Sequence, residues 1–288
     1  MSTTTPAAGP GATDGRDALL LDSITSASPQ AAGRIVVTGS HGGRYAAALA
    51  LRAGVAAVIF NDASIGRDRA GVAGLDLLDA AGVPGAAVDH RSARIGDAAD
   101  ALARGELSVV NAAGRERGWQ PGMRTERAVA VAAGRPAATA RPAPEPPEEG
   151  RHLIAPGPVE IWALDSASLV READAGAIVA TGSHGGLVGG RPEAALRVAA
   201  RAALFNDAGG GAGTTRLGAL QARGIAAATV SAASARIGDG RSTYEDGVLS
   251  AVNDAAAALG GSPGMDARAF ADLVRARAAA AAAAESVR

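Results

Sequence analysis

The chain has 288 residues and a formal charge of −1, which comes from 28 basic and 29 acidic side chains. It contains no cysteine, so disulfides, cysteine-ligated zinc, iron–sulfur clusters and a thiolate nucleophile are excluded. The near-neutral charge, without basic runs or ladders of aromatic residues, also argues against a nucleic-acid partner.

The N-terminal residues 1–17 are polar and rich in Pro, Gly and Thr, and we predict that they form a disordered tail. No apolar run reaches the length of about 18 residues that a membrane-spanning helix needs. We therefore expect a cytoplasmic protein with no membrane partner. Aromatic residues make up only 2% of the chain. Small aliphatic side chains must therefore form the core, and we expect homo-oligomerisation to add buried area.

Three motifs occur twice, in the same order and at a nearly constant separation, which indicates an internal duplication. The pairs are Thr-Gly-Ser-His-Gly-Gly at 38–43 and 181–186, Phe-Asn-Asp-Ala at 60–63 and 205–208, and Ser-Ala-Arg-Ile-Gly-Asp at 92–97 and 234–239. We predict two homologous α/β repeats, a proline-rich linker between them and a C-terminal helix. Their limits are 18–133 for the first repeat, 134–151 for the linker, 152–265 for the second repeat and 266–288 for the helix.

Each repeat is expected to alternate strands and helices in the same order. In the first repeat the apolar runs and the glycines that follow them predict strands and helices in turn. The strands are expected over 35–37, 55–60 and 83–88, and the helices over 46–53 and 72–81. In the second repeat the strand over 225–230 is the counterpart of 83–88. The capping box Ser-Thr-Tyr-Glu at 242–245 is expected to start the next helix.

Alternating strands and helices predict a parallel sheet with right-handed crossovers and helices on both faces. The fold class is therefore α/β, with two Rossmann-like βαβαβα halves related by a pseudo-two-fold axis. Open parallel sheets bind ligands outside the carboxyl ends of their strands, where all three motifs begin. Since neighbouring strands lie roughly 5 Å apart, the His, Asp and Arg of each half are expected within about 12 Å of one another.

The first motif suits an anion or an oxyanion, because glycines before a helix leave backbone N–H groups free to face a ligand. His41 and His184 are predicted as general acid or base, and Ser40 and Ser183 as possible nucleophiles. The N–H groups of the glycines are expected to form an oxyanion hole. These glycines are Gly42, Gly43, Gly185 and Gly186. Alternatively, the glycines only permit a tight turn and the histidines only cap or pack.

The second motif places an amide and a carboxylate at the end of the second strand. Asp62 and Asp207 are predicted to orient the neighbouring imidazoles, as the carboxylate of a catalytic triad does. Asn61 and Asn206 are predicted to bind substrate. An Asx turn or a helix N-cap is the structural alternative.

The third motif places an arginine just beyond the third strand. Arg94 and Arg236 are predicted to anchor an anionic substrate, because guanidinium recognises carboxylate and phosphate in a bidentate way. The alternative is a structural brace in which each arginine pairs with the aspartate three residues later. Those aspartates, Asp97 and Asp239, are predicted to be helix N-caps.

The two halves differ after the third strand. The first half has Asp-His-Arg-Ser at 89–92, and the second half has Ser-Ala-Ala-Ser at 231–234. His90 is therefore unique to the first half and is predicted to bind substrate. The halves combine into one asymmetric pocket, or one site works and the other is structural. The fourth histidine, His152, is expected to be exposed in the linker.

These residues predict an enzyme that acts on a small, polar, anionic metabolite, with hydrolysis of an amide-type C–N bond as the leading reaction. One alternative is a cofactor-independent racemase or isomerase that uses the paired histidines, and another is a protein that binds a small ligand without catalysis. No cofactor is predicted, and a divalent metal held by His and Asp is a further alternative. The duplicated α/β plan is similar to the aspartate/glutamate racemases in architecture only, because those enzymes rely on two cysteines.

Overall fold

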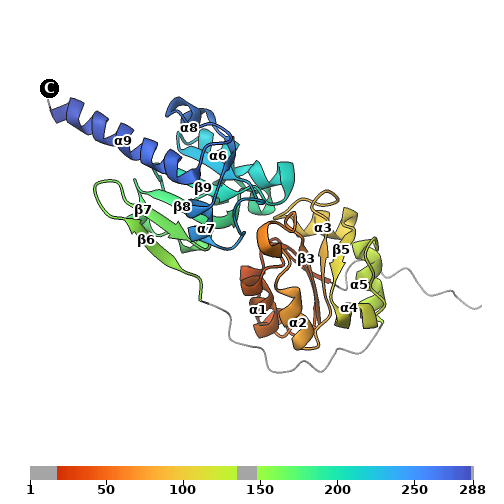
Figure 1. Ribbon diagram of the computed structural model, residues 1–288. Helices are drawn as coiled ribbons and strands as arrows, with labels where there is room; N and C mark the ends of the chain where they lie inside the picture. Colours follow the sequence, from red (N-terminus) through yellow and green to blue (C-terminus); the bar gives the residue numbers. More distant parts are fainter. Residues whose placement is uncertain (1–17, 135–147, 287–288) are drawn as a thin grey trace, which may run out of the picture.

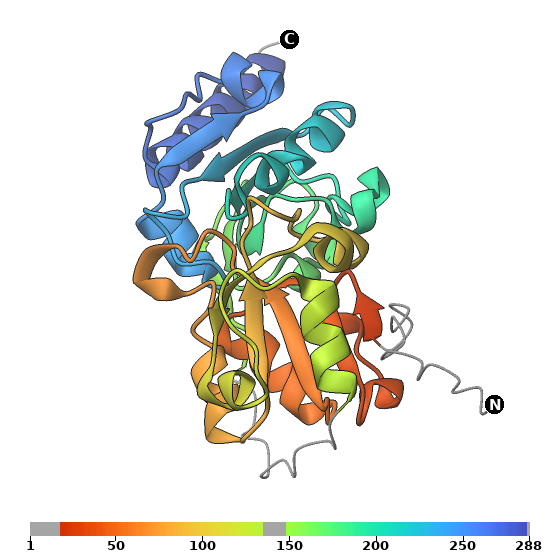
Figure 2. The same ribbon diagram turned by 90° about the vertical axis from the view of Figure 1, so that its right-hand side faces the viewer.

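The computed structural model describes residues 18–134 and 148–286, which form two mostly parallel sheets with helices packed against them (Figures 1 and 2). The predicted tail over 1–17 and most of the predicted linker lie outside the described residues. The α/β fold class is confirmed. Within the described residues, no helix combines the length and the apolar character needed to cross a bilayer.

The first sheet has five strands that neighbour one another in chain order. They are β1 (Ala18–Leu21), β2 (Ile35–His41), β3 (Ala57–Asn61), β4 (Gly85–Val88) and β5 (Leu107–Val110), and only β5 runs antiparallel to its neighbour. The α-helices are α1 (Arg44–Arg52), α2 (Leu75–Ala80), α3 (Ala98–Arg104), α4 (Ala112–Glu116) and α5 (Thr125–Ala133).

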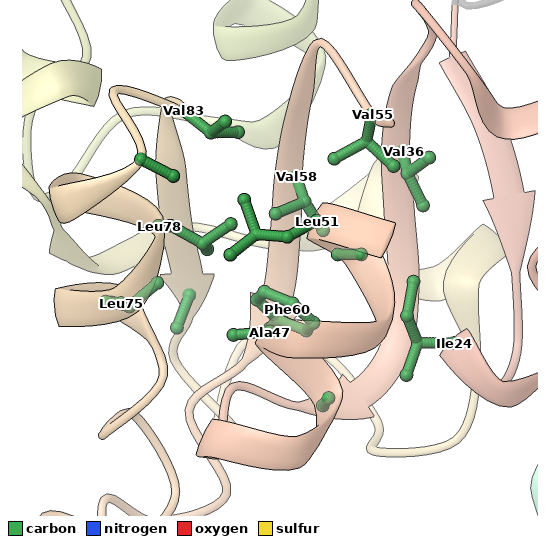
Figure 3. Packing of buried hydrophobic residues seen from close by; sticks show 14 of the residues in the cluster. Ile24, Val36, Ala47, Leu51, Val55, Val58, Phe60, Leu75, Leu78 and Val83 are labelled. Carbon is green, nitrogen blue, oxygen red and sulfur yellow. The ribbon is translucent and has the colours of Figure 1, made fainter. Parts of the chain in front are cut away.

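Helices cover both faces of this sheet, so alternate strand residues enter two separate cores. Val36 and Phe60 pack against α1 and α2 on one face (Figure 3), and Val37 and Ile59 pack toward α3 and α5 on the other. Trp119 is almost fully buried in the second core and donates its indole N–H to the carbonyl of Ala128.

The second sheet has six strands in the order β11-β10-β9-β8-β7-β6. They are β6 (Arg151–Ala155), β7 (Ile161–Leu164), β8 (Ile178–His184), β9 (Ala202–Asn206), β10 (Ala226–Val230) and β11 (Leu249–Val252), with β6 and β11 antiparallel at the edges. The α-helices are α6 (Arg216–Gln221), α7 (Gly240–Glu245), α8 (Asp254–Ala258) and α9 (Ala267–Ser286). Helix α9 lies within the segment 266–288 predicted as a C-terminal helix, and its Phe270 packs under the sheet.

Several local predictions are wrong. Strands β2 and β8 continue through the first motif to its histidine, so the expected glycine loop starts later. His152 lies partly buried in β6, because this segment pairs with β7 and is not a linker. Helix α7 begins at Gly240 with Asp239 as its N-cap, so the predicted capping box does not start it.

The second half also has no counterpart of α1. The segment after its first motif forms two short 3₁₀ turns, Val188–Gly190 and Pro192–Ala194. Gly189 and Gly190 adopt positive φ there, and a proline follows, which opposes a regular helix at this point. The expectation that a helix follows both copies of the first motif therefore fails in the second half.

The two halves meet through the second and third motifs and their near neighbours. Ala63, Ile95, Ala208, Ala232 and Ile237 form one buried apolar cluster. Backbone N–H groups of each half donate across it, from Arg67 to the Ala232 carbonyl and from Gly189 to the Gly96 carbonyl, at 2.8 Å in both cases. The contact between the halves therefore explains four apolar members of these motifs, Ala63, Ile95, Ala208 and Ile237.

A strained turn follows the second motif in the first half. Ala63, Ser64, Ile65, Asp68 and Arg69 all have φ between 50° and 61°, a region that costs an L-residue roughly 1–2 kcal/mol. The second half places Gly209 and Gly210 in the same region. Ser64 gains a contact in exchange, because its Oγ accepts the N–H of Gly209 at 3.1 Å.

We expect Arg69→Gly to stabilise the protein by about 0.5–1 kcal/mol, because glycine relieves the left-handed strain at a modest entropic cost. The exposed Arg69 side chain makes no ion pair or hydrogen bond with the described residues. Urea unfolding measures the change. The control Arg201→Gly replaces an exposed arginine outside the left-handed region and is expected to destabilise. An equal decrease in the free energy of unfolding in both variants would show that Arg69 is not strained.

Candidate functional site

The two histidines of the first motif stand in equivalent positions, each at the last residue of its strand. His41 Nδ1 accepts the N–H of Gly43 at 3.1 Å, and His184 Nδ1 accepts the N–H of Gly186 at 3.1 Å. Each ring packs against the third motif of the other half. A Cβ added to Gly238 would lie 3.5 Å from His41 Cε1, and one added to Gly96 would lie 3.4 Å from His184 Cε1.

These contacts fix the chemical form of both rings. A backbone N–H can only donate, so Nδ1 must carry a lone pair and the proton of the neutral ring sits on Nε2. Burial lowers the pKa of His41 to about 4. Burial, and then the charges of Arg216 and His41, lower the pKa of His184 to about 3. At neutral pH each ring is therefore a neutral Nε2–H donor, whereas the predicted general base would need a free Nε2.

One cavity of about 520 Å³ contains both histidines and lies between the halves. Its polar lining includes Ser40, His41, Tyr45, Glu149, Asp165, Ser183, His184 and Arg216. The structure therefore brings together the two histidines and the two serines of the first motif. This corresponds to the first of the two predicted arrangements, a single asymmetric pocket.

Glu149 adds a titratable acid to this cavity. Its burial, and then the nearby charge of Asp165, raise the pKa of Glu149 to about 7, although a hydrogen bond from the Tyr45 hydroxyl acts in the opposite direction. Asp165 itself is held by two backbone N–H groups, from Gly240 at 3.0 Å and from Gly150 at 2.7 Å. A carboxyl group with a pKa near 7 is suited to general acid–base catalysis.

The glycine N–H groups do not form the predicted oxyanion hole, because all four are engaged within the protein. Gly43 and Gly186 donate to the imidazoles. Gly42 donates to the carbonyl of Asn61 at 3.2 Å, and Gly185 donates to that of Asn206 at 2.7 Å. These bonds tie the end of each first strand to its neighbour. Neither imidazole Nε2 is hydrogen-bonded to a described residue, so both remain available as donors.

The serines do not form nucleophile–base pairs with any described residue. Ser40 Oγ accepts the N–H of Ile24, and Ser183 Oγ accepts the N–H of Ala167, both at 2.9 Å. Each hydroxyl therefore holds the turn that follows the preceding strand.

The asparagines are structural. Asn61 and Asn206 are fully buried. Each donates to a carbonyl of the third motif, Ala93 at 3.1 Å and Ala235 at 3.0 Å, and each accepts the N–H two residues later. Both side chains are fully buried and bonded to backbone, so the structure does not support the predicted substrate contact.

The arginines of the third motif form the predicted structural brace. Arg94 pairs with Asp97 at 2.9 Å, and Arg236 pairs with Asp239 at 3.2 Å. Arg236 also pairs with Asp68 of the other half at 3.2 Å. Both aspartates cap the helices that follow, as predicted. Because Arg94 lines a separate depression, it does not join His41 at one rim.

The second-motif aspartates also lie apart from the first-motif histidines. Asp207 Oδ1 accepts the N–H of Ala232 at 2.7 Å and does not contact His184. Asp62 Oδ1 accepts the equivalent N–H, that of His90, at 3.1 Å. The predicted pairing with His41 and His184 is therefore wrong, because these carboxylates tie together the ends of the second and third strands.

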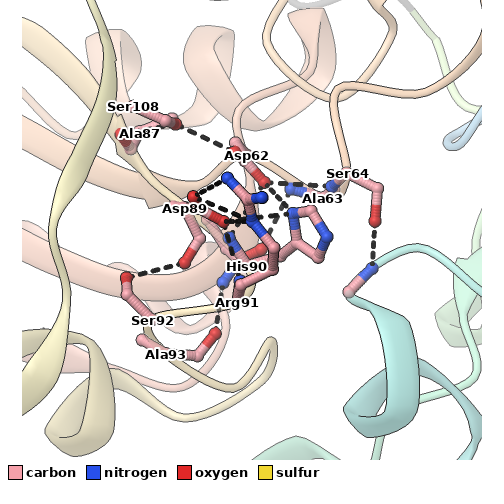
Figure 4. A network of polar contacts seen from close by, with 12 residues as sticks. Asp62, Ala63, Ser64, Ala87, Asp89, His90, Arg91, Ser92, Ala93 and Ser108 are labelled. Carbon is pink, nitrogen blue, oxygen red and sulfur yellow. Dashed lines mark hydrogen bonds and ion pairs between the residues drawn. The ribbon is translucent and has the colours of Figure 1, made fainter. Parts of the chain in front are cut away.

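Asp62 instead orients His90 (Figure 4). Its Oδ1 lies 2.9 Å from His90 Nδ1, and its Oδ2 accepts the Ser108 hydroxyl at 2.9 Å. Among the described residues, Asp62, Asp89 and His90 form the one group spaced closely enough for a metal ion. Its oxygens already accept bonds from His90, Ser108 and Arg91. The predicted metal alternative at His41, His184 and the two aspartates has no geometric support.

Sequence analysis missed Glu149, Asp165 and Arg216. The repeat contained a signal for Asp165, because Leu-Asp-Ser at 21–23 recurs at 164–166 in register with the first motif. Glu149 lies in the segment predicted as a linker, and no pattern marks it. Arg216 lies at a position where the halves differ, so a search for repeated residues passes over it.

We found no match to this chain among protein-family models, curated proteins or solved structures. Function therefore has to be inferred from the geometry of the site.

Proposed function

We propose that the chain is an enzyme that acts on the carbonyl group of a small polar metabolite, by hydrolysis of an amide-type C–N bond. One observation carries this proposal: two neutral imidazole N–H donors, one from each half, share a cavity with a carboxyl group whose pKa is about 7.

In this mechanism His41 and His184 donate Nε2–H bonds to the carbonyl oxygen, whose negative charge grows as the tetrahedral intermediate forms. A neutral imidazole is suited to this task because it gives up no proton to the oxygen. The histidines thus replace the glycine N–H groups as the oxyanion hole. Removing one such donor typically costs a factor of 10²–10³ in rate.

Glu149 is the general base and acid of the proposed reaction. As a carboxylate it takes a proton from water, and the resulting hydroxide adds to the carbonyl carbon. It then returns that proton to the nitrogen as the C–N bond breaks, which yields a carboxylic acid and an amine. Since the base form is required, kcat/KM is expected to rise with pH through about 7.

We also propose that the halves are copies of one unit related by a pseudo-two-fold axis. Equivalent residues make the same bonds in both halves, as the histidine, asparagine and aspartate pairs illustrate. Such an axis would bring the two imidazoles to one cavity from opposite sides. Homo-oligomerisation stays a prediction.

The test is a screen of small amides, ureas and cyclic imides for release of ammonia or amine, followed by variants assayed on the substrate found. We expect His41→Asn and His184→Asn each to lower kcat/KM by about 10²–10³-fold, because asparagine keeps an acceptor for the glycine N–H and loses the Nε2–H. We expect Glu149→Gln to lower it by about 10²–10⁴-fold.

The control Glu106→Gln, at an exposed residue away from the cavity, is expected to retain full turnover. Full turnover in both histidine variants would refute the proposal. Deuterium uptake from solvent into recovered substrate, without C–N cleavage, would instead identify an isomerase or racemase. Tight binding without any conversion would identify a binding protein.

A further inference from the structure

The two halves differ at a closely packed position beside the cavity, where the first half has Gly74 and the second half has Arg216. In the first half the N–H of Gly74 donates to the Gly42 carbonyl at 2.8 Å, and in the second half the N–H of Arg216 donates to the Gly185 carbonyl at 2.7 Å. Arg216 therefore takes the place of Gly74. A Cβ on Gly74 would lie 2.5 Å from the Cβ of Ala47 in α1, so glycine is required there.

The second half has no helix equivalent to α1, and the Arg216 side chain enters the space that such a helix would fill. It is 5% exposed. Its Nε donates to the Gly186 carbonyl at 3.0 Å, Nη1 donates to the Ala195 carbonyl, and the guanidinium lies 5.0 Å from the centre of the Phe205 ring. Part of the segment that replaces the helix lines the same cavity, including Val188, Arg191 and Arg197.

This guanidinium has no counter-ion in the described part of the chain, where no carboxylate lies within ion-pair distance of it. Burial lowers the pKa of Arg216 only to about 10, so the group stays cationic at neutral pH. Its bonds to described residues start from Nε and Nη1, which leaves Nη2 and one hydrogen of Nη1. A buried, uncompensated cation at a cavity wall is stabilised by an anion that enters the cavity.

We propose that Arg216 binds a carboxylate group of the substrate, so that the substrate is a small amide carrying one carboxylate. This assignment rests on the proposed function in placing the reacting carbonyl in the same cavity. A planar carboxylate fits the fork of a single guanidinium. A phosphate suits the site less well, because Glu149 and Asp165 would face its second charge and the nearby glycine N–H groups are already engaged.

The test compares propionate with propionamide, which have the same shape and differ in charge, and adds inorganic phosphate as a third probe. For the wild type we expect propionate to bind at least about tenfold more tightly than propionamide. In Arg216→Met this preference is expected to disappear. The control is Arg223→Met. Arg223 follows α6 and also donates to carbonyls, those of Leu196 and Val198, and its replacement is expected to leave the preference for propionate unchanged.

A second measurement needs no variant at Arg216 and so does not depend on its folding. Because the Arg216 charge acts on His184, propionate bound to Arg216 at pH 7 should shift the signals of the His184 imidazole nitrogens, which NMR of the labelled protein detects. Equal binding of propionate and propionamide, tighter binding of phosphate, or unchanged signals of the His184 imidazole at saturating propionate would each overturn the assignment.

The two proposals can fail separately. Glu149→Gln is expected to lower turnover by about 10²–10⁴-fold and to leave the preference for propionate in place. If propionate binds through Arg216 and no amide is turned over, the proposed hydrolysis fails and the carboxylate site stands. If neutral amides are turned over without any preference for a carboxylate, the assignment of Arg216 fails and the proposed reaction stands.

Discussion

Lowering the pH from 7 to 5 is expected to reduce the free energy of unfolding by about 4 kcal/mol through His41 and His184 alone. Both rings are neutral in the folded protein, with pKa values of about 4 and about 3 against an ordinary value of 6.5. Below pH 6.5 the unfolded chain binds two protons that the folded chain excludes. Each histidine then removes about 1.4 kcal/mol per pH unit until its folded-state pKa is reached.

Urea unfolding at pH 7, 6 and 5 measures this loss, and the double variant His41→Asn/His184→Asn isolates it. Other groups also titrate in this range, and the raised pKa of Glu149 acts in the opposite direction because the folded state then binds the extra proton. These contributions cancel in the difference between wild type and variant. The wild type should therefore lose stability more steeply, and parallel curves would show that the imidazoles already accept protons in the folded state.

The α/β class and the central strands followed from the sequence because apolar β-branched runs before glycines are a local signal. The edge strands did not. Strand β6 lies directly after a proline-rich segment, and its identity depends on pairing with β7, which is a tertiary effect. The absence of a counterpart of α1 in the second half was not predicted either, because the elements of that half were inferred from those of the first half.

For the site, the repeat drew attention to His41 and His184, and the structure places both in one cavity. For the other two motifs, repetition did not indicate site residues, because residues that form contacts between the halves are repeated as well. Ile95 and Ile237 form such a contact, and Arg236 pairs with Asp68 across it. Spacing along one chain could not show that each histidine faces the third motif of the opposite half.

The asymmetric positions are the better guide to chemistry here. The shared asparagines, Asn61 and Asn206, hold backbone in both halves, whereas the shared histidines, His41 and His184, line the cavity. Where the halves differ, a cavity with a buried cation opens at Arg216, and an imidazole joins a carboxylate at His90. Residues that hold the fold in both halves are constrained, so positions where the halves differ, such as Arg216 and His90, are free to acquire a chemical role.

A loss of stability of similar size is expected from a substitution at Gly182, the first glycine of the second copy of the first motif. We expect Gly182→Ala to destabilise the protein by about 3–5 kcal/mol, because the new methyl group has no space. Its Cβ would lie 2.6 Å from the carbonyl carbon of Gly238 and 2.7 Å from the carbonyl oxygen of Asp165. Both are backbone atoms, so relief requires a shift of the loop that packs against His41.

Gly218→Ala is the matched control, because Gly218 lies exposed within α6 and a Cβ there meets nothing within 4 Å. Its expected effect is a stabilisation of about 0.5–1 kcal/mol, from the higher helix propensity of alanine. Urea unfolding of both variants gives the comparison. If Gly182→Ala unfolded within about 1 kcal/mol of the wild type, a typical change for a point mutant, the loop at Gly238 would be free to move away. The contact between this loop and the His41 ring would then not be a fixed part of the cavity.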